Sequence, residues 1–253
     1  MYTIEEVNFA GIPCLSVHPD QAQANRVIIG YHGWTNTKES VLPQAIAFAR
    51  QGFQVILPDA YLHGQRRPAG YHYQPQVDLL ASLAHNCQEF DQLSQAVLAH
   101  YQVDQVAIFG TSMGGMTVSL IIAGYRDRLA AAVQYIAALD LEAQLDQLSQ
   151  GKLGASIKSD LTPDQAADQA QYWAYIKDHN LARQTNQIAG LPFYIYNGGQ
   201  DDWVKTAINR QLVPQIKQAI DPDLVDFTIF EDQDHWVPFE IMTASAAYIS
   251  KFY

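Results

Sequence analysis

Short apolar runs that each end in a loop containing Gly or Pro constrain the fold of this chain more than any other feature. An uninterrupted apolar run of three or four residues is typical of a strand that is buried on both faces of a parallel sheet. The clearest runs cover residues 27–29, 55–57, 106–109 and 193–196, and segments with a helical pattern lie at about 38–50, 76–100, 113–125, 204–219 and 237–251. Because strands and helices alternate, we expect an α/β fold with a mostly parallel, doubly wound sheet flanked by helices.

The length of the chain and this single pattern predict one domain over residues 1–253. Residues 2–9 and 12–17 alternate more loosely, and we expect them to form an antiparallel hairpin at the edge of the sheet. A last strand is expected over residues 225–230, directly before the final helix.

One segment breaks the alternation, because about 50 residues follow the strand predicted near 132–137 before the next strand begins. Inside this segment, Thr162, Pro163 and Gln165 form the start of a helix, with Thr as the N-cap, Pro at the first position and Gln at the third. We expect residues 141–188 to form a small inserted helical cap over the loop end of the sheet. The alternative is one more helix that packs on the sheet.

The formal net charge of −11 makes nucleic acid and anionic membranes poor partners, because an acidic surface repels phosphate. The two cysteines, Cys14 and Cys87, fit no metal-binding spacing; we expect two reduced, buried thiols, with one disulfide as the alternative. The first residues lack the basic and apolar regions of a signal peptide. Residues 105–125 carry no charge, but their Gly, Ser and Thr favour a buried strand, a turn and a helix over a membrane span. We therefore expect a soluble cytoplasmic protein.

Residues 110–114, with the sequence Gly-Thr-Ser-Met-Gly, match the pattern G-x-S-x-G between an apolar strand and an apolar helical run. The pattern places a serine at the tip of a sharp strand-to-helix turn, where a strained backbone exposes its hydroxyl. Gly110 and Gly114 allow the strand and the helix to approach each other without a Cβ clash. Ser112 is therefore the candidate nucleophile.

A serine nucleophile needs a general base, and eight histidines compete for that role. On a sheet with this serine turn the groups follow in the chain order serine, acid, histidine, which leaves His179 and His235. His179 falls at the end of the predicted cap helix. His235 follows the last predicted strand, where a base is expected, so we assign the base to His235.

The acid that orients such a base should lie just past the end of a strand. Asp201 and Asp202 both stand in the loop after the strand predicted at 193–196, and their place in the loop does not separate them. The aspartate that is not the acid would be a helix N-cap or first-turn residue.

The oxyanion of a tetrahedral intermediate needs two backbone N–H donors. We expect one from Met113, which follows the nucleophile, and one from Trp34, which follows Gly33 in the loop after the strand that contains residues 27–29.

A second loop, over residues 58–67, contains Asp59 and Arg66, which we expect to form an internal ion pair that shapes the rim of the site. His63 in the same loop precedes Ser112, so the chain order argues against it as the base.

Taken together, these residues resemble the α/β-hydrolase superfamily over essentially the whole chain. More narrowly, the chain is similar to small bacterial esterases related to dienelactone hydrolases and to the catalytic domain of prolyl oligopeptidases. The resemblance rests on His32-Gly33-Trp34, Pro58-Asp59, His63-Gly64, Arg66, residues 110–115, Gly198-Gly199-Gln200-Asp201, Val204 and Asp234-His235. It implies hydrolysis of a carboxylic ester through an acyl-enzyme, without a metal or an organic cofactor.

The resemblance also bears on the acid and on the substrate. In such proteins the acid commonly stands three residues after a Gly and three before a Val, and this frame favours Asp201 over Asp202. Lys205 stands where a Pro often follows that Val. Dienelactone hydrolases have cysteine where this chain has Ser112, and prolyl oligopeptidases carry a propeller domain for which this chain has no room. The absence of this cysteine and of a propeller domain favours a small ester as substrate over a peptide.

The sequence thus predicts a serine hydrolase with Ser112, Asp201 and His235 as its triad, no cofactor, and a small-molecule ester or acyl compound as its partner. A small peptidase or thioesterase of the same fold, or a non-catalytic ligand-binding relative, are the alternatives. The aromatic residues Trp34, Tyr172, Trp173 and Trp236 are candidates for an apolar substrate pocket, although each could equally be a core residue.

Overall fold

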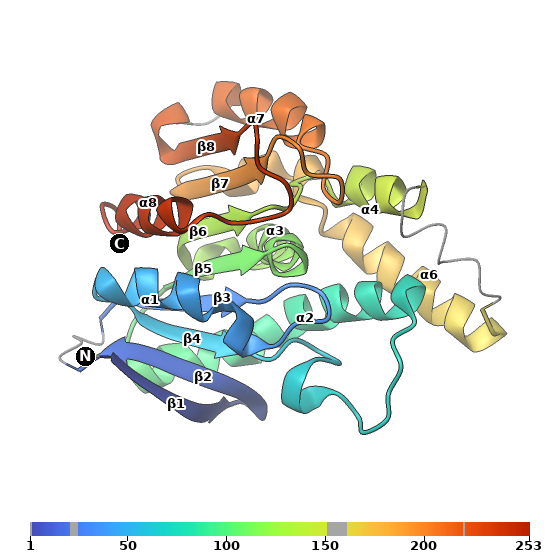
Figure 1. Cartoon of the computed structure of the whole chain (residues 1–253), viewed down its shortest axis with the longest axis horizontal. Coiled ribbons are helices and arrows are strands. Elements are labelled where there is room, and N and C mark those ends of the chain that lie inside the picture. The colour runs from blue at the N-terminus through green and yellow to red at the C-terminus, as the bar shows by residue number, and fades with distance from the viewer. Residues whose placement is uncertain (1, 21–24, 151–160, 220) are drawn as a thin grey trace.

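Eight strands form one twisted sheet in the computed structural model, which describes residues 2–20, 25–150, 161–219 and 221–253. The strand order is β1-β2-β4-β3-β5-β6-β7-β8, as Figure 1 shows. The strands are β1 (Tyr2–Phe9), β2 (Ile12–Pro19), β3 (Val27–Tyr31), β4 (Gln54–Pro58), β5 (Val106–Thr111), β6 (Leu129–Tyr135), β7 (Phe193–Gly198) and β8 (Val225–Phe230). β1 and β2 pair antiparallel, as do β2 and β4, and all remaining pairs are parallel. The predicted α/β sheet and its antiparallel edge hairpin are confirmed.

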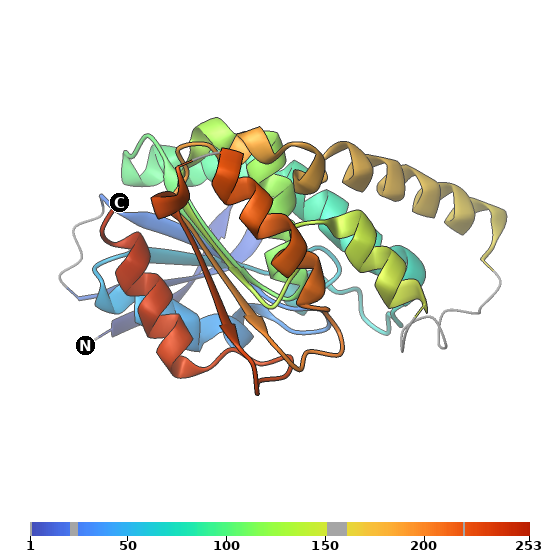
Figure 2. The same ribbon diagram turned by 90° about the horizontal axis from the view of Figure 1, so that it is seen from above.

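Helices cover both faces of the sheet, as Figure 2 shows from above. They are α1 (Leu42–Arg50), α2 (Pro75–Tyr101), α3 (Met113–Tyr125), α4 (Leu141–Gln150), α6 (Pro163–Asp178), α7 (Ala207–Ala219) and α8 (Phe239–Ile249). Helices α1 and α8 lie against one face and contact each other, whereas α2, α3 and α7 lie against the other. The predicted helices are confirmed, although α7 begins at Ala207, a few residues later than expected.

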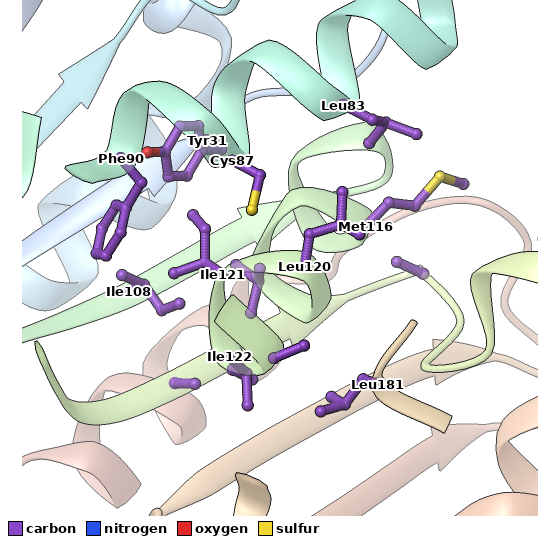
Figure 3. Packing of buried hydrophobic residues seen from close by; sticks show 14 of the residues in the cluster. Tyr31, Leu83, Cys87, Phe90, Ile108, Met116, Leu120, Ile121, Ile122 and Leu181 are labelled. Carbon is purple, nitrogen blue, oxygen red and sulfur yellow. The ribbon is translucent and has the colours of Figure 1, made fainter. Parts of the chain in front are cut away.

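The core has two halves because successive strand side chains point to opposite faces of the sheet. In β7, Phe193 and Ile195 belong to the half under α3 and α7, while Tyr194 and Tyr196 belong to the half under α8. Figure 3 shows part of the larger half, where side chains of α2, α3 and the sheet meet around Cys87. Each fully buried Leu, Ile or Phe in such a core stabilises the fold by about 1.5–3 kcal/mol.

Neither cysteine takes part in a disulfide: Cys14 and Cys87 are free and buried, as expected. The uncharged stretch 105–125 divides into β5, the turn at Ser112 and the buried helix α3. Among the described helices, none is long and apolar enough to cross a membrane.

The segment 141–188 lies between β6 and β7 and, apart from residues 151–160, which fall outside the described ranges, is mostly helical. The predicted helix start is confirmed, since Thr162 and Gln165 form a reciprocal capping box in front of α6. In Figure 1, α4 and α6 extend beyond the carboxyl ends of the strands. Helix α6 packs mainly along α2, with a smaller contact to α4. A role of this segment as a cap over the site stays a prediction.

Candidate active site

Ser112 stands in the sharp turn between β5 and α3, at the carboxyl edge of the sheet. Its φ of 57° and ψ of −116° lie in a region that residues with a side chain rarely adopt. The Ser112 N–H donates to the carbonyl of Tyr135, and the N–H of Met116 donates to the carbonyl of Ser112, both at 3.0 Å. A Cβ at Gly114 would lie 2.1 Å from the carbonyl oxygen of Tyr31. Glycine at this position therefore allows the start of α3 to approach the end of β3.

His235 joins Ser112 to Asp201 through two hydrogen bonds. Nε2 of His235 lies 2.9 Å from Oγ of Ser112, and Nδ1 of His235 lies 2.7 Å from Oδ2 of Asp201. A carboxylate only accepts hydrogen bonds, so the Nδ1 of His235 carries the proton and its Nε2 accepts from the serine hydroxyl. This is the arrangement that a general base needs in order to take a proton from a serine.

Asp201 is buried, and the backbone that follows it fixes its carboxylate. Its Oδ1 accepts the N–H groups of Trp203 and Val204, at 2.8 and 2.9 Å, which leaves Oδ2 for His235. Asp202 is exposed instead, and its carboxylate accepts a hydrogen bond from Nζ of Lys205 at 2.7 Å. The structure thus brings Asp201 to the histidine and points Asp202 away from it.

The loops that hold Asp201 and His235 are joined to each other. The N–H of Gln200 donates to the carbonyl of Gln233 at 2.8 Å, so the two loops run side by side. A Cβ at Gly198 would lie 2.2 Å from the carbonyl oxygen of Asp234, so only glycine permits this approach. The close contact sets the distance between the carboxylate and the imidazole.

The two predicted oxyanion donors lie on the segments that flank Ser112. A Cβ at Gly33 would lie 3.6 Å from Cβ of Ser112, so the loop that continues to Trp34 passes directly beside the nucleophile. Met113 is the first residue of α3, and its N–H belongs to the first helical turn, where N–H groups have no partner within the helix. The amino end of a helix also favours negative charge. The role of these two N–H groups stays a prediction.

A cavity of about 680 Å³ opens beside Ser112 and His235. Trp34 and Trp236, both predicted to form the pocket, line it. Other apolar side chains of the wall gave no sequence signal, because they come from separate segments of the chain: these are Val41, Pro43, Ile136, Trp203, Val237, Phe239 and Met242. None of the described residues that line the cavity is Asp, Glu, Lys or Arg. Within the described ranges, no group of three or more His, Cys, Asp or Glu side chains could hold a metal ion.

Tyr172 and Trp173, the other two predicted pocket residues, do not line this cavity. Both lie on α6, which packs along α2. Trp173 borders a second cavity of about 380 Å³ between α2, α4 and α6. The hydroxyl of Tyr172 lies 3.4 Å from Nε2 of His85 on α2. The packing of α6 against α2 therefore places both aromatic side chains outside the wall of the cavity beside Ser112.

The ion pair predicted between Asp59 and Arg66 is wrong, because Lys38 and not Arg66 pairs with the Asp59 carboxylate. Nζ of Lys38 lies 3.0 Å from Oδ2 of Asp59, and the backbone N–H of Lys38 donates to Oδ1 at 3.1 Å. The guanidinium of Arg66 binds both carboxylate oxygens of Glu89 on α2 instead, at 2.7 and 2.8 Å. Lys38 is buried although Thr37 is only partly buried and Glu39 is exposed, so its sequence context gave no signal of this role.

Comparison with known proteins agrees with this architecture. A family model described as serine aminopeptidase, S33, matches residues 22–178, which is more than half of the chain. Among curated proteins, the putative esterase YitV of Bacillus subtilis is 27% identical over 254 residues, with 94% of each chain covered. The esterase YjfP of Escherichia coli is 28% identical over 211 residues, covering 81% of this chain and 80% of its own.

Solved structures share the fold. The crystal structure of TT1662 from Thermus thermophilus superposes with a TM-score of 0.77 at 16% identity, and the match covers 100% of this chain and 98% of the other. At that identity the similarity speaks for the fold, whereas the family match rests on the sequence itself. The chain therefore belongs to the serine aminopeptidase S33 family of α/β-hydrolases.

Proposed function

We propose that this protein is a serine esterase that cleaves a small, uncharged carboxylic ester through an acyl-enzyme on Ser112. The observation that carries the proposal is the unbroken hydrogen-bond chain from Oγ of Ser112 through His235 to the buried Asp201. A triad confers hydrolysis only where the nucleophile is also accessible, and Ser112 opens onto the cavity beside it. The names of the two curated relatives, both esterases, point the same way.

In the acylation half of the proposed reaction, Oγ of Ser112 attacks the acyl carbonyl carbon while its proton passes to Nε2 of His235. Asp201 stabilises the imidazolium that forms. The N–H groups of Trp34 and Met113 donate to the oxyanion of the tetrahedral intermediate. When the intermediate collapses, the bond to the alcohol oxygen breaks, and the alcohol leaves with the proton from Nε2.

Deacylation repeats these steps with water as the nucleophile. Nε2 of His235 takes a proton from the water, whose oxygen attacks the carbonyl carbon of the acyl-enzyme. The second tetrahedral intermediate collapses by breaking its bond to Oγ of Ser112, which recovers its proton from His235. The products are one carboxylic acid and one alcohol, and the enzyme returns to its starting state.

The lining of the cavity favours an ester as substrate over a peptide with a free amino terminus. An aminopeptidase substrate brings a free ammonium group into the site, and a charged group taken out of water needs an opposite charge beside it. Aromatic and aliphatic side chains, with no charged side chain among the described residues, instead suit an uncharged acyl or alcohol group. We therefore expect p-nitrophenyl esters to be turned over far faster than alanine p-nitroanilide.

The experiment that tests this function compares wild type with Ser112→Ala on p-nitrophenyl acetate. Turnover should vanish in the variant while its circular dichroism spectrum stays that of wild type. A fluorophosphonate probe should label wild type and not Ser112→Ala. Full activity in the variant would exclude Ser112 as the nucleophile, and no labelling of wild type would favour a ligand-binding protein.

A series of p-nitrophenyl esters with longer acyl chains tests the apolar pocket. Each buried methylene contributes about 0.8 kcal/mol, so kcat/KM should rise about fourfold per methylene until the cavity is filled. A flat series would show that the acyl group does not enter the apolar part of the cavity.

A further inference from the structure

Two histidines beside the candidate active site are locked in one neutral form by backbone hydrogen bonds. Nε2 of His63 accepts the N–H of Thr35 at 3.1 Å, and its Nδ1 lies 2.7 Å from the carbonyl oxygen of Tyr61. Nε2 of His32 accepts the N–H of Ala60 at 3.0 Å. A backbone N–H can only donate, so each Nε2 must be unprotonated and each Nδ1 must carry the hydrogen. Burial lowers the pKa of both imidazoles, which agrees with neutral rings.

These bonds hold the two peptide units around Trp34. Nδ1 of His32 donates to the carbonyl of Gly33 at 2.9 Å, and this carbonyl belongs to the same planar peptide unit as the N–H of Trp34. The bond from Thr35 to His63 fixes the next peptide unit. The ring of His63 also contacts the indole of Trp34, with the ring centroids 5.0 Å apart.

The backbone at Thr35 requires such a restraint. Its φ is 61°, in the left-handed region that β-branched residues rarely adopt. A residue in this region is strained and persists only where its surroundings over-determine it. The hydrogen bond to His63 is the contact that holds the N–H of this residue.

The loop that presents His63 is itself built on a buried charge. Asp59 accepts the N–H of Gln65 at 3.0 Å and pairs with Lys38. Gly64 has a φ of 52°, and a Cβ there would lie 2.0 Å from Oδ1 of Asp59, so only glycine lets the carboxylate sit under this turn. Lys38 begins the short 3-10 helix that follows the Trp34 loop. The buried ion pair between Lys38 and Asp59 therefore joins the loop that carries the acceptor, His63, to the loop that carries the donor, the N–H of Thr35.

We propose that His63 is a positioning residue for the oxyanion hole: it holds the strained Thr35 backbone so that the N–H of Trp34 faces the reacting carbonyl beside Ser112. This inference rests on the proposed esterase function and adds a residue to it. His63 does not touch the substrate in this account. Its Nε2 acts only as an acceptor for a backbone N–H.

Two amide substitutions separate this role from simple packing. In His63→Gln the side-chain carbonyl can replace Nε2 as the acceptor for Thr35, whereas in His63→Asn the shorter amide can replace only the Nδ1–H donor to Tyr61. We expect His63→Asn to lose about 10- to 100-fold in kcat with KM changed less than about threefold, because the N–H of Trp34 stabilises the transition state rather than the bound substrate. His63→Gln should retain kcat within about threefold of wild type.

His179 provides the matched control. Its Nδ1 also lies 2.9 Å from a backbone carbonyl, that of Tyr175, and its ring stacks on the Tyr175 ring, but it lies at the end of α6. His179→Asn and His179→Gln should both keep kcat within about twofold. Equal losses in His63→Asn and His63→Gln, or a loss in KM alone, would overturn the proposal.

The protonation state of His63 supplies a readout that does not depend on activity. Long-range ¹H–¹⁵N NMR of wild type should show His63 with hydrogen on Nδ1, and the amide signal of Thr35 should shift more in His63→Asn than in His63→Gln. Hydrogen on Nε2 would refute the inference even if the ester assay succeeds. If wild type turns over no ester, the proposed function fails, and the NMR result still decides whether His63 holds this loop.

Discussion

Replacing Asp201 by Asn should disable the candidate triad through the tautomer of His235 rather than through the fold. Oδ1 of Asp201 accepts two backbone N–H groups, from Trp203 and Val204. In Asp201→Asn only the amide oxygen can accept these bonds, so the amide NH₂ must face His235 in place of Oδ2. Nδ1 of His235 then has to accept, which moves the ring hydrogen to Nε2 and removes the acceptor for the Ser112 hydroxyl.

The size of the effect follows from this reversal. A triad with the wrong histidine tautomer loses about 10⁴ in kcat in the well-studied serine proteases, which corresponds to about 5 kcal/mol of transition-state stabilisation. We expect a loss of that order for Asp201→Asn on p-nitrophenyl acetate, with little change in KM. The unfolding temperature should change by only a few degrees, because the two backbone hydrogen bonds and the volume of the side chain are kept.

Asp202→Asn is the natural control, since it makes the same substitution one residue away on an exposed side chain. It should keep kcat within about twofold, because its carboxylate contacts Lys205 and not His235. A loss smaller than tenfold in Asp201→Asn, or a larger loss in Asp202→Asn, would refute the argument. Hydrogen on Nδ1 of His235 in Asp201→Asn, seen by ¹⁵N NMR, would refute it as well.

Three further predictions concern stability. Ser112→Gly should be about 1 kcal/mol more stable than Ser112→Ala, or about 2–4 °C higher in unfolding temperature, because glycine relieves the strained backbone at residue 112; equal temperatures would contradict this. Lys38→Met should lower the free energy of urea unfolding by about 3 kcal/mol, because Asp59 then stays buried without its ion-pair partner; a loss under 1 kcal/mol would show that the two backbone donors suffice. Burial lowers the pKa of His32 from 6.5 to about 4, so between these two values the imidazole is protonated in the unfolded chain and neutral in the folded chain. The unfolding free energy should therefore fall by about 2 kcal/mol from this group as the pH is lowered from 7 to 5. His32→Asn should reduce this dependence of the unfolding free energy on pH.

The fold was predictable because its signals are local. A strand buried on both faces is mostly apolar, and β3, β4, β5 and β7 each contain the uninterrupted apolar run that this requires. The turn at Ser112 is equally local, because the contacts that require glycine lie within the motif or at the end of the neighbouring strand. Chain order then limited the choice of histidine.

The wall of the cavity and the ion pairs were not predictable in the same way. Trp203, Phe239 and Met242 come from segments that meet only when β7 and α8 are in place. The partner of Asp59 depends on how two loops fold against each other, and Lys38 is 21 residues away from it. Trp173 is an aromatic residue of the kind that lines pockets, but the packing of α6 on α2 places it at the cavity between α2, α4 and α6. Side-chain pairing between distant loops has no periodicity that a sequence pattern can express.

The three histidines around Ser112 show how identical side chains acquire different chemistry from their partners. His32, His63 and His235 all carry hydrogen on Nδ1 and accept at Nε2. At His32 and His63 the group that donates to Nε2 is a peptide N–H, which does not give up its proton near neutral pH, so these rings can only hold the backbone in place. At His235 the donor is a serine hydroxyl, whose proton can transfer once its oxygen attacks a carbonyl, and Nδ1 faces a carboxylate that stabilises the resulting cation. The capacity for catalysis thus depends on the donor at one nitrogen and the charge at the other, and removing either, as Ser112→Ala or Asp201→Asn does, should leave His235 unable to act as the base.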